Sequence, residues 1–224
     1  MSNNSTLIIG ANGTIGSALA SAYEQQGTMI TLSRNEIDYE EEGLKKASAT
    51  LKQEHSFSQI ICCIGTLHDD VVQPEKSLRQ ISTTALEHYF YVNSILPALV
   101  IKHFSPLLSK TQISRFVCLS AMVGSTSDNK SGSWYGYRSS KAALNSLIKS
   151  TSIELKRTHK YSVVTAIHPG TTVGSLTAPF AKNINPDKYY TPEQTAQRIK
   201  NVIAELKPEQ TGDFLNWDGS QLPW

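Results

Sequence analysis

The sequence has little cysteine, and the pattern of the three that it holds indicates neither a disulfide framework nor a metal centre. Cys62, Cys63 and Cys118 lie inside apolar runs, without CxxC spacing and without histidine partners. We interpret them as small buried side chains in a reducing compartment. The six histidines show neither HExxH spacing nor another ligand-like pattern, so we expect no bound metal.

Long apolar runs and an excess of one charge are also missing. No apolar run approaches the ~20 residues of a membrane span, and the N-terminal MSNNSTLIIG lacks a basic region followed by a secretory apolar core. The 21 basic and 19 acidic residues are spread along the chain, without the basic stripe that binds nucleic acid. We therefore expect a cytoplasmic protein with no membrane and no nucleic-acid partner. A length of 224 residues suits one well-filled core, which predicts a single domain over residues 1–224.

A glycine turn follows the first apolar segment of the chain. Residues 6–9 read as a strand and pass directly into GANGTIG at residues 10–16, after which apolar side chains recur at helical spacing. Glycine permits close approach of a ligand, and a helix start favours an anion. This order predicts a site for the pyrophosphate of a dinucleotide, whereas the alternative is a purely structural turn. The cofactor contacts expected here are Gly10, Asn12, Gly13, Thr14, Ile15 and Gly16.

The second predicted strand, residues 28–32, ends in Ser33-Arg34-Asn35. In dinucleotide folds an acidic residue at this point bonds the ribose 2′-hydroxyl, whereas an arginine accommodates a 2′-phosphate. Arg34, with no acid beside it, therefore favours NADP(H) over NAD(H), and the alternative is a solvated loop arginine. Asp38, a further expected cofactor contact, is predicted to close a very short third strand, followed by a helix to about residue 52.

Strands continue to alternate with helices along the rest of the chain. Gly65 closes the first of the further buried strands, which are predicted at residues 59–64, 115–120, 162–167 and 213–217. Further helices are predicted at residues 84–108, directly after Trp134, and at 193–206, while residues 171–192 lack periodicity and are expected to form a substrate lid. The pattern predicts the α/β class: a single-domain Rossmann fold with a doubly wound, mostly parallel sheet and helices on both faces.

Polar side chains are expected together at the carboxyl edge of this sheet. Tyr137 and Lys141 are four residues apart, which on a helix places them about 6 Å from each other on one face. An ammonium beside a phenol predicts a general acid-base, whereas the same spacing also occurs on solvated helix faces. Asn93 lies on an apolar segment that Pro97 should kink, which indicates either a polar role or a satisfied core amide. The strand at 115–120 delivers Ser120 to the same edge.

The order of these motifs resembles the short-chain dehydrogenase/reductase superfamily over nearly the whole chain. The resemblance rests on the glycine turn, the strand ending in Gly65, Val92-Asn93, the Ser120 strand, Tyr137-x-x-x-Lys141 and His168-Pro169-Gly170. LSAMVGS, DNKSGSWYGYRSSKAALN, HPGTTVGSLTAPF and the closing NWDGSQLPW are similar to the C-factor-like branch, which is related to carbonyl reductases.

The resemblance implies roles for individual residues. Tyr137 would give a proton to a substrate carbonyl, Lys141 would lower the Tyr137 pKa and hold the nicotinamide ribose, and Asn93 would hold a water for proton resupply. A serine hydroxyl would orient the carbonyl, with Ser120 as our first choice. Further cofactor contacts would come from Gly65, Pro169, Gly170, Thr172 and Val173. These roles imply NADPH-dependent reduction of an aldehyde or ketone to an alcohol, in a homodimer or homotetramer.

The sequence also departs from the pattern of the superfamily. The glycines are spaced GxxGxxG where many members have GxxxGxG, and Cys63-Ile64-Gly65 stands where members have Asn-Ala-Gly. Aligning on Gly124 puts Ala121 at the position of the catalytic serine, which leaves Ser125 as the reserve for Ser120. The alternative function is therefore an NAD(P)-binding signalling or regulatory protein of the C-factor type with little or no turnover.

Overall fold

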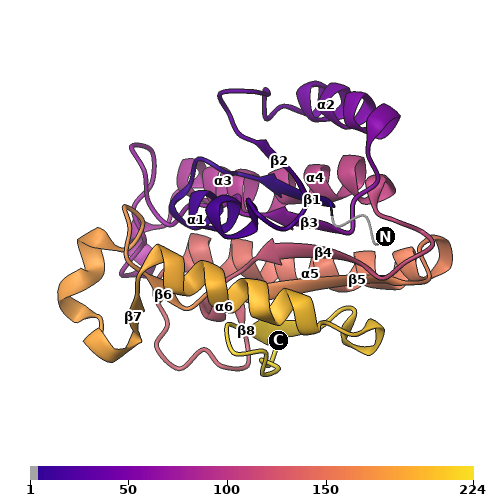
Figure 1. The fold of residues 1–224 in the computed structure, drawn as a ribbon. Helices are drawn as coiled ribbons and strands as arrows, with labels where there is room; N and C mark the ends of the chain where they lie inside the picture. The colour runs from indigo at the N-terminus through magenta and orange to yellow at the C-terminus, as the bar shows by residue number, and fades with distance from the viewer. Residues whose placement is uncertain (1–4) are drawn as a thin grey trace.

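The computed structural model describes residues 5–224, apart from the side chain of residue 183. Its centre is a parallel sheet of six strands in the order β2-β1-β3-β4-β5-β8 (Figure 1). The strands of this sheet are β1 Ser5–Ile9, β2 Thr28–Leu32, β3 Gln59–Cys62, β4 Ser114–Leu119, β5 Ser162–His168 and β8 Phe214–Asn216. A separate pair is formed by β6 Thr171–Thr172 and β7 Tyr189–Tyr190. Residues 1–4, which entered the argument against a secretory signal, lie outside the described residues.

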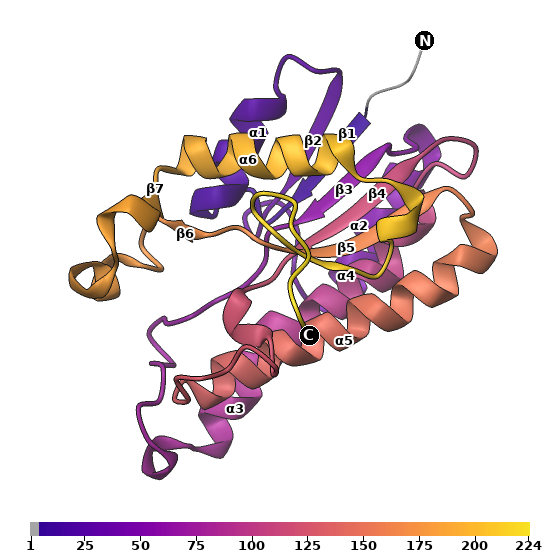
Figure 2. The same cartoon turned by 90° about the horizontal axis from the view of Figure 1, so that it is seen from below.

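Helices cover both faces of the sheet, as the alternation predicted. The helices are α1 Thr14–Tyr23, α2 Glu41–Glu54, α3 Thr83–Phe90, α4 Leu96–Phe104, α5 Tyr135–Thr158 and α6 Pro192–Glu205. Figure 2 shows α1 and α6 on one side of the strands and α4 and α5 on the other. No helix of residues 5–224 has the length and apolar character needed to cross a membrane. The doubly wound Rossmann architecture expected from the sequence is confirmed.

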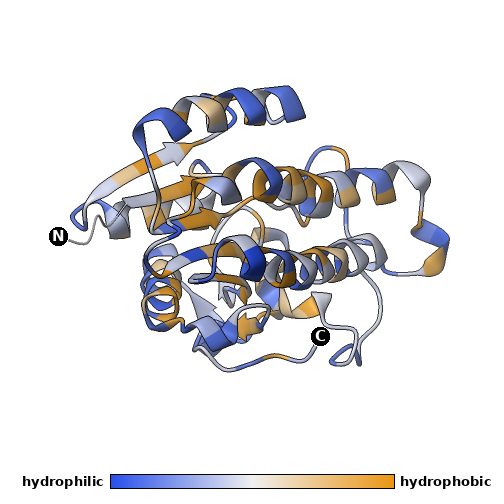
Figure 3. Cartoon of the chain, turned by 90° about the vertical axis from the view of Figure 1, so that its right-hand side faces the viewer, coloured by the Kyte–Doolittle hydropathy of each residue, from blue (hydrophilic) through white to orange (hydrophobic). Residues whose placement is uncertain are grey.

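The core is divided between the two faces because successive side chains of a strand point in opposite directions. Leu7 and Ile9 of β1 pack with α2, α4 and α5, whereas Ile8 packs with α1 and α6. In Figure 3 the apolar strands lie between helices that also carry hydrophilic stretches. Strands that are covered on both faces read as continuous apolar runs, which is why most of the predicted strands agree with the structure to within about two residues.

The third strand predicted at Asp38 is wrong, because α2 joins β2 directly to β3 in the described chain. The residues after β2 form turns instead. A carboxylate oxygen of Asp38 accepts the backbone N–H of Glu40 at 3.2 Å, and the Tyr39 hydroxyl donates to the carbonyl of Leu32 at 3.3 Å. Local side-chain bonds of this kind compete with strand pairing. Within the described residues, β2 is therefore an edge strand.

The interruption predicted in the segment 84–108 is present. The α-helical bonding stops after α3, one π-helical turn spans Tyr91–Ile95, and α4 begins with Pro97 in its first turn. Proline has no N–H for the helical ladder, and π turns admit an extra residue that redirects the side chains. Asn93 lies within this turn, and its side chain is completely buried.

Candidate active site

The glycine turn forms the end of the site nearest β1. Gly10 follows β1 with a φ of +89°, a conformation that favours glycine. At Gly16, a Cβ atom would lie 2.2 Å from the carbonyl oxygen of Gly10, so α1 packs directly on the turn. Gly13, the N-cap of α1, supplies no side-chain cap for the first helical N–H groups. These N–H groups and the helix dipole give the turn the properties of an anion-binding site, which could hold a pyrophosphate.

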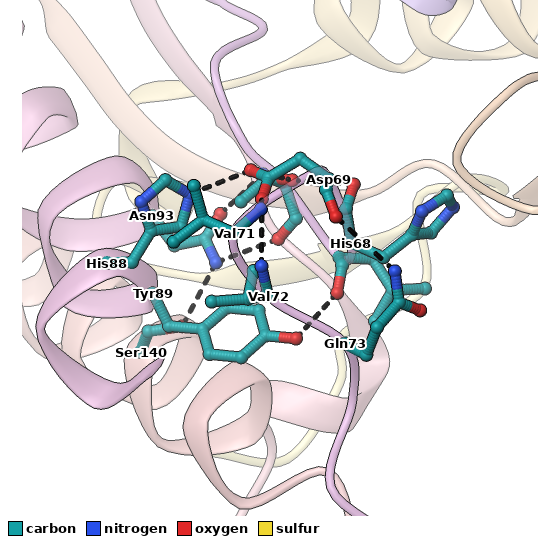
Figure 4. A network of polar contacts seen from close by, with 11 residues as sticks. His68, Asp69, Val71, Val72, Gln73, His88, Tyr89, Asn93 and Ser140 are labelled. Atoms are coloured by element: carbon teal, nitrogen blue, oxygen red, sulfur yellow. Dashed lines mark hydrogen bonds and ion pairs between the residues drawn. The ribbon is translucent and has the colours of Figure 1, made fainter. Parts of the chain in front are cut away.

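Asn93 connects three elements beside this turn (Figure 4). Its Oδ1 accepts the N–H of Thr66 at 2.8 Å, and its Nδ2 donates to the carbonyl of Thr66 at 2.9 Å and to Ser140 Oγ at 3.1 Å. The amide therefore joins the loop after β3 to the π turn and to α5. Asn93 is a satisfied core amide, which was one of the two alternatives left by the sequence, and its role with a water stays a prediction.

Lys141 lies in the same corner of the site. Its side chain is only 4% exposed, and Nζ donates to the carbonyl of Leu119 at the end of β4 at 3.0 Å. Gly65 leaves space for it, since a Cβ there would lie 2.9 Å from Lys141 Nζ and 3.2 Å from Asn93 Oδ1. Burial lowers the pKa of Lys141 to about 8, while the Cys62 thiol acts in the opposite direction. The ammonium is therefore charged at neutral pH but can exchange its proton.

Tyr137 occupies the first turn of α5 and is 8% exposed. Its ring centroid lies 6.2 Å from that of Trp134 and 6.3 Å from that of Tyr89. Burial raises the pKa of the Tyr137 phenol above its ordinary value. The sequence predicted a lowered pKa through Lys141, but desolvation of the phenol dominates in the structure. The phenol therefore holds its proton at neutral pH, and its role as a proton donor stays a prediction.

The serine candidates both have partners elsewhere. Ser120 Oγ donates to Asn145 Oδ1 at 2.7 Å in a buried pair, and Ser125 Oγ accepts the N–H of Asp128 at 3.1 Å. Ala121 is the residue of this segment that joins the buried cluster around Tyr137. The carbonyl-orienting role assigned to Ser120 stays a prediction, and it would require the hydroxyl to leave Asn145.

The segment that begins with Pro169-Gly170 reaches the glycine turn from the other side. Gly170 has a φ of +81°, and a Cβ at Gly174 would lie 2.8 Å from Thr14 Oγ1. Thr172 Oγ1 shares a hydrogen bond of 2.9 Å with Thr195 of α6, and the N–H of Val173 donates to the carbonyl of Tyr190 at 2.8 Å. The segment after β5 therefore approaches the start of α1 at Thr14.

The side chains predicted to contact the cofactor after β2 are exposed. Arg34 follows β2 with an exposed side chain, and no ion pair within residues 5–224 involves it. Asp38 is exposed as well and uses its carboxylate in the turn before α2. Both side chains are near the carboxyl end of β2, but their contacts with a cofactor stay predictions.

The loop after β3 contributes residues that the sequence did not single out. The Tyr89 hydroxyl donates to the carbonyl of Leu67 at 2.7 Å, and Asp69 pairs with His88 at 2.7 Å (Figure 4). His68 Nε2 lies 3.1 Å from the carbonyl oxygen of Ser175, in the predicted lid. Tyr89 belongs to the apolar stripe of the predicted helix, but nothing in the local sequence pattern indicates the bonds made by this loop.

Comparisons with known proteins agree with this arrangement. No family model matches the chain. It is 30% identical over 135 residues to C-signal of Myxococcus xanthus, a match that covers 60% of this chain and 76% of that protein. The chain belongs to the short-chain dehydrogenase/reductase superfamily.

Two further matches bear on its place in the superfamily. An uncharacterized oxidoreductase of Schizosaccharomyces pombe is 31% identical over 146 residues, which span 61% of this chain but only 57% of the yeast protein. An NADPH-bound carbonyl reductase from chicken fatty liver has a TM-score of 0.82 with 18% identity, over 99% of this chain and 94% of that structure. The likeness to C-signal supports the C-factor-like branch of short-chain dehydrogenases/reductases.

The first prediction tests the close packing at the glycine turn of this short-chain dehydrogenase/reductase. Gly16→Ala should destabilise the protein by about 1–3 kcal/mol, because the new Cβ collides with the backbone of the turn. This loss outweighs the ~1 kcal/mol by which alanine normally favours a helix over glycine. Gly13→Ala is the matched control, since its Cβ would meet the Gly10 oxygen at 3.4 Å. Urea unfolding of the cofactor-free proteins measures both, and equal free energies would contradict the geometry.

The second prediction concerns the serine of the superfamily. Ser120→Ala should cost about 1–3 kcal/mol of stability, because Asn145 Oδ1 loses its buried donor. If Ser120 orients the carbonyl as predicted, turnover should also fall by ~100-fold or more. Steady-state kinetics well below the unfolding temperature measure the second effect. Turnover within about threefold of the wild-type value would contradict the predicted orienting role and leave the Ser120 hydroxyl as a partner of Asn145 alone.

Proposed function

We propose that the protein is an NADPH-dependent oxidoreductase that reduces the carbonyl of an aldehyde or ketone to an alcohol, with Tyr137 as the proton donor. The observation that carries the proposal is the buried corner at the ends of β3 and β4, where Gly65 leaves room for Lys141 and Asn93, with the buried Tyr137 one turn earlier on α5. The uncapped glycine turn follows the neighbouring strand β1. The sequence left two alternatives, a purely structural glycine turn and a Tyr–Lys pair on a solvated helix face. Neither alternative explains why these side chains are buried at the same end of the sheet.

The residues present fit a dinucleotide. Gly10, Gly13 and Gly16 leave the backbone of the turn accessible and the first N–H groups of α1 without a side-chain cap. Lys141 would hold the nicotinamide ribose, while Thr172 and Val173 would lie near the carboxamide. When bound, the cofactor supplies a hydride to the carbonyl carbon.

The chain's own residues would manage the proton. The Tyr137 O–H bond breaks as a new O–H bond forms on the substrate oxygen, so the phenol must hold its proton until that moment, and a pKa raised by burial is consistent with this. Lys141 would then stabilise the resulting phenolate, because its ammonium is charged below a pH of about 8. A water held at Asn93 would return a proton to this pair.

The position of Arg34 supports the preference for NADP(H) over NAD(H). Arg34 is exposed at the end of β2 and makes no ion pair with the residues that the structure describes, and a guanidinium here suits a 2′-phosphate better than a ribose diol. The solved structure with bound NADPH from chicken fatty liver shares the fold, which supports NADP(H) at this site.

Aromatic side chains support a modest, partly aromatic carbonyl substrate. The Trp134 ring lies against both Tyr137 and Phe180, with a centroid distance of 5.4 Å to Phe180. Phe180 belongs to the segment 171–192, which we propose as the lid. We also propose that two copies pair through their long helices, as the resemblance to the superfamily implies.

A second candidate function is a nucleotide-binding signalling protein with little turnover. The likeness to C-signal favours it, as does the engagement of the Ser120 hydroxyl with Asn145. One experiment separates the two functions, because only a reductase needs the Tyr137 hydroxyl.

The third prediction is the test of the proposed activity. Wild-type protein should oxidise NADPH in the presence of at least one carbonyl from a panel of aldehydes, diketones and quinones, and Tyr137→Phe should lower that turnover by ~100-fold or more. NADPH absorbance follows the reaction, and cofactor fluorescence checks that the variant still binds. Binding of NADPH with equal turnover by the two proteins on every compound would favour the signalling function.

The fourth prediction concerns the choice of cofactor. Arg34→Asp should weaken NADPH binding by ~10-fold or more, since one charge-assisted bond to the 2′-phosphate is lost and a repulsion is added. NADH binding should change by less than about threefold. Titration of cofactor fluorescence gives both dissociation constants. Equal effects on the two cofactors would remove Arg34 from the phosphate site.

A further inference from the structure

Glu75 is a buried carboxylate that the proposed reaction does not use. It is 3% exposed, and no ion pair within the described chain involves it. Its two carboxylate oxygens lie 3.2 and 3.1 Å from the backbone nitrogen of Gly136, which donates to them. Its own carbonyl oxygen accepts the N–H of Trp134 at 2.6 Å. Burying a charge without a cation is unfavourable, so the start of α5 has to compensate it.

The start of α5 needs such a partner. Its N-cap, Trp134, has left-handed backbone angles and makes no side-chain cap bond, and Ser133 before it also has a positive φ of 55°. The first N–H groups of a helix have no partner within the helix. A carboxylate at this position accepts a hydrogen bond from them and is also stabilised by the positive end of the helix dipole. Glu75 therefore acts as the missing cap, although it is 61 residues away from Gly136 in the sequence.

The packing at this point is tight. A Cβ atom on Gly136 would lie 2.4 Å from Tyr89 Cδ2 and 2.9 Å from Glu75 Oε1. Tyr89 is itself fixed by its hydrogen bond to the carbonyl of Leu67, in the same loop as Glu75. The peptide that immediately precedes Tyr137 is thus clamped between the loop after β3 and α3.

We propose that Glu75 is a positioning residue that holds the Tyr137 phenol in place for proton transfer by capping α5. The reaction part of this inference rests on the proposed function, whereas the capping part does not. A displacement of about 1 Å in a reacting group can cost ~100-fold in rate, so the first turn of α5 has to be held firmly. Glu75 also couples the loop that bears Thr66 and His68 to the helix that bears Tyr137 and Lys141.

The experiment compares Glu75→Ala, Glu75→Gln and the control Glu87→Ala, which removes an exposed carboxylate from α3. Glu75→Ala should lower kcat about 10- to 100-fold and leave the dissociation constant of NADPH within about threefold. Glu75→Gln keeps an oxygen that accepts the Gly136 N–H and should recover at least about half of that loss on a logarithmic scale. Hydrogen exchange measured by mass spectrometry should accelerate in residues 134–141 of Glu75→Ala, but not in β3 or β4.

Two results would overturn the inference. One is that residues 134–141 of Glu75→Ala exchange at the wild-type rate, which would show that Glu75 does not cap α5. The other is equal acceleration of exchange throughout the sheet, which would make Glu75 a residue of general stability. If the wild-type protein reduces no carbonyl, the proposed function fails, and the exchange pattern alone still decides whether Glu75 caps α5.

Discussion

The site depends on keeping one ammonium group buried at the carboxyl ends of β3 and β4. Desolvation opposes this, and the hydrogen bond from Lys141 Nζ to the carbonyl of Leu119 compensates only part of the cost. The rest of the arrangement follows from the space that the ammonium needs. A Cβ at Gly65 would lie 2.9 Å from the Lys141 Nζ atom, and a Cβ at Gly124 would lie 2.8 Å from the Lys141 Cβ atom, so one glycine makes room for the ammonium and the other for the helix that carries it. Asn93 then fills the remaining side of the corner through bonds to Thr66 and Ser140.

The sequence predicted those parts of the molecule that rest on local patterns. The continuous apolar run at β3 indicated a strand covered on both faces, and Pro97 indicated the interruption that became the π turn. The strand predicted at Asp38 was wrong because short polar side chains form turns as readily as they end a strand. The motifs near Tyr137 could be recognised from their order along the chain, since each follows directly from a strand end or a helix start.

Contacts between distant segments could not be predicted in the same way. Ser120 occupies the end of a strand as expected, but whether its hydroxyl faces Tyr137 or Asn145 depends on a side-chain choice that no spacing encodes. Glu75 lies in a loop without periodicity, and its partner is 61 residues further along. The pKa of Tyr137 could not be predicted from spacing either. The spacing of Tyr137 and Lys141 suggested a lowered phenol pKa, whereas burial of the ring in the folded protein raises it.

These contacts bear on the two candidate functions together. A signalling protein that only binds a nucleotide needs the glycine turn and the strand ends. It does not need a buried carboxylate at the start of α5. Glu75, the glycine at position 136 and Tyr89 are packed tightly around the peptide that precedes Tyr137. The engaged Ser120 hydroxyl reduces the number of donors for a carbonyl, but it does not affect this packing. Rigid support of one phenol is what proton transfer requires, and it therefore favours the reductase over the signalling protein.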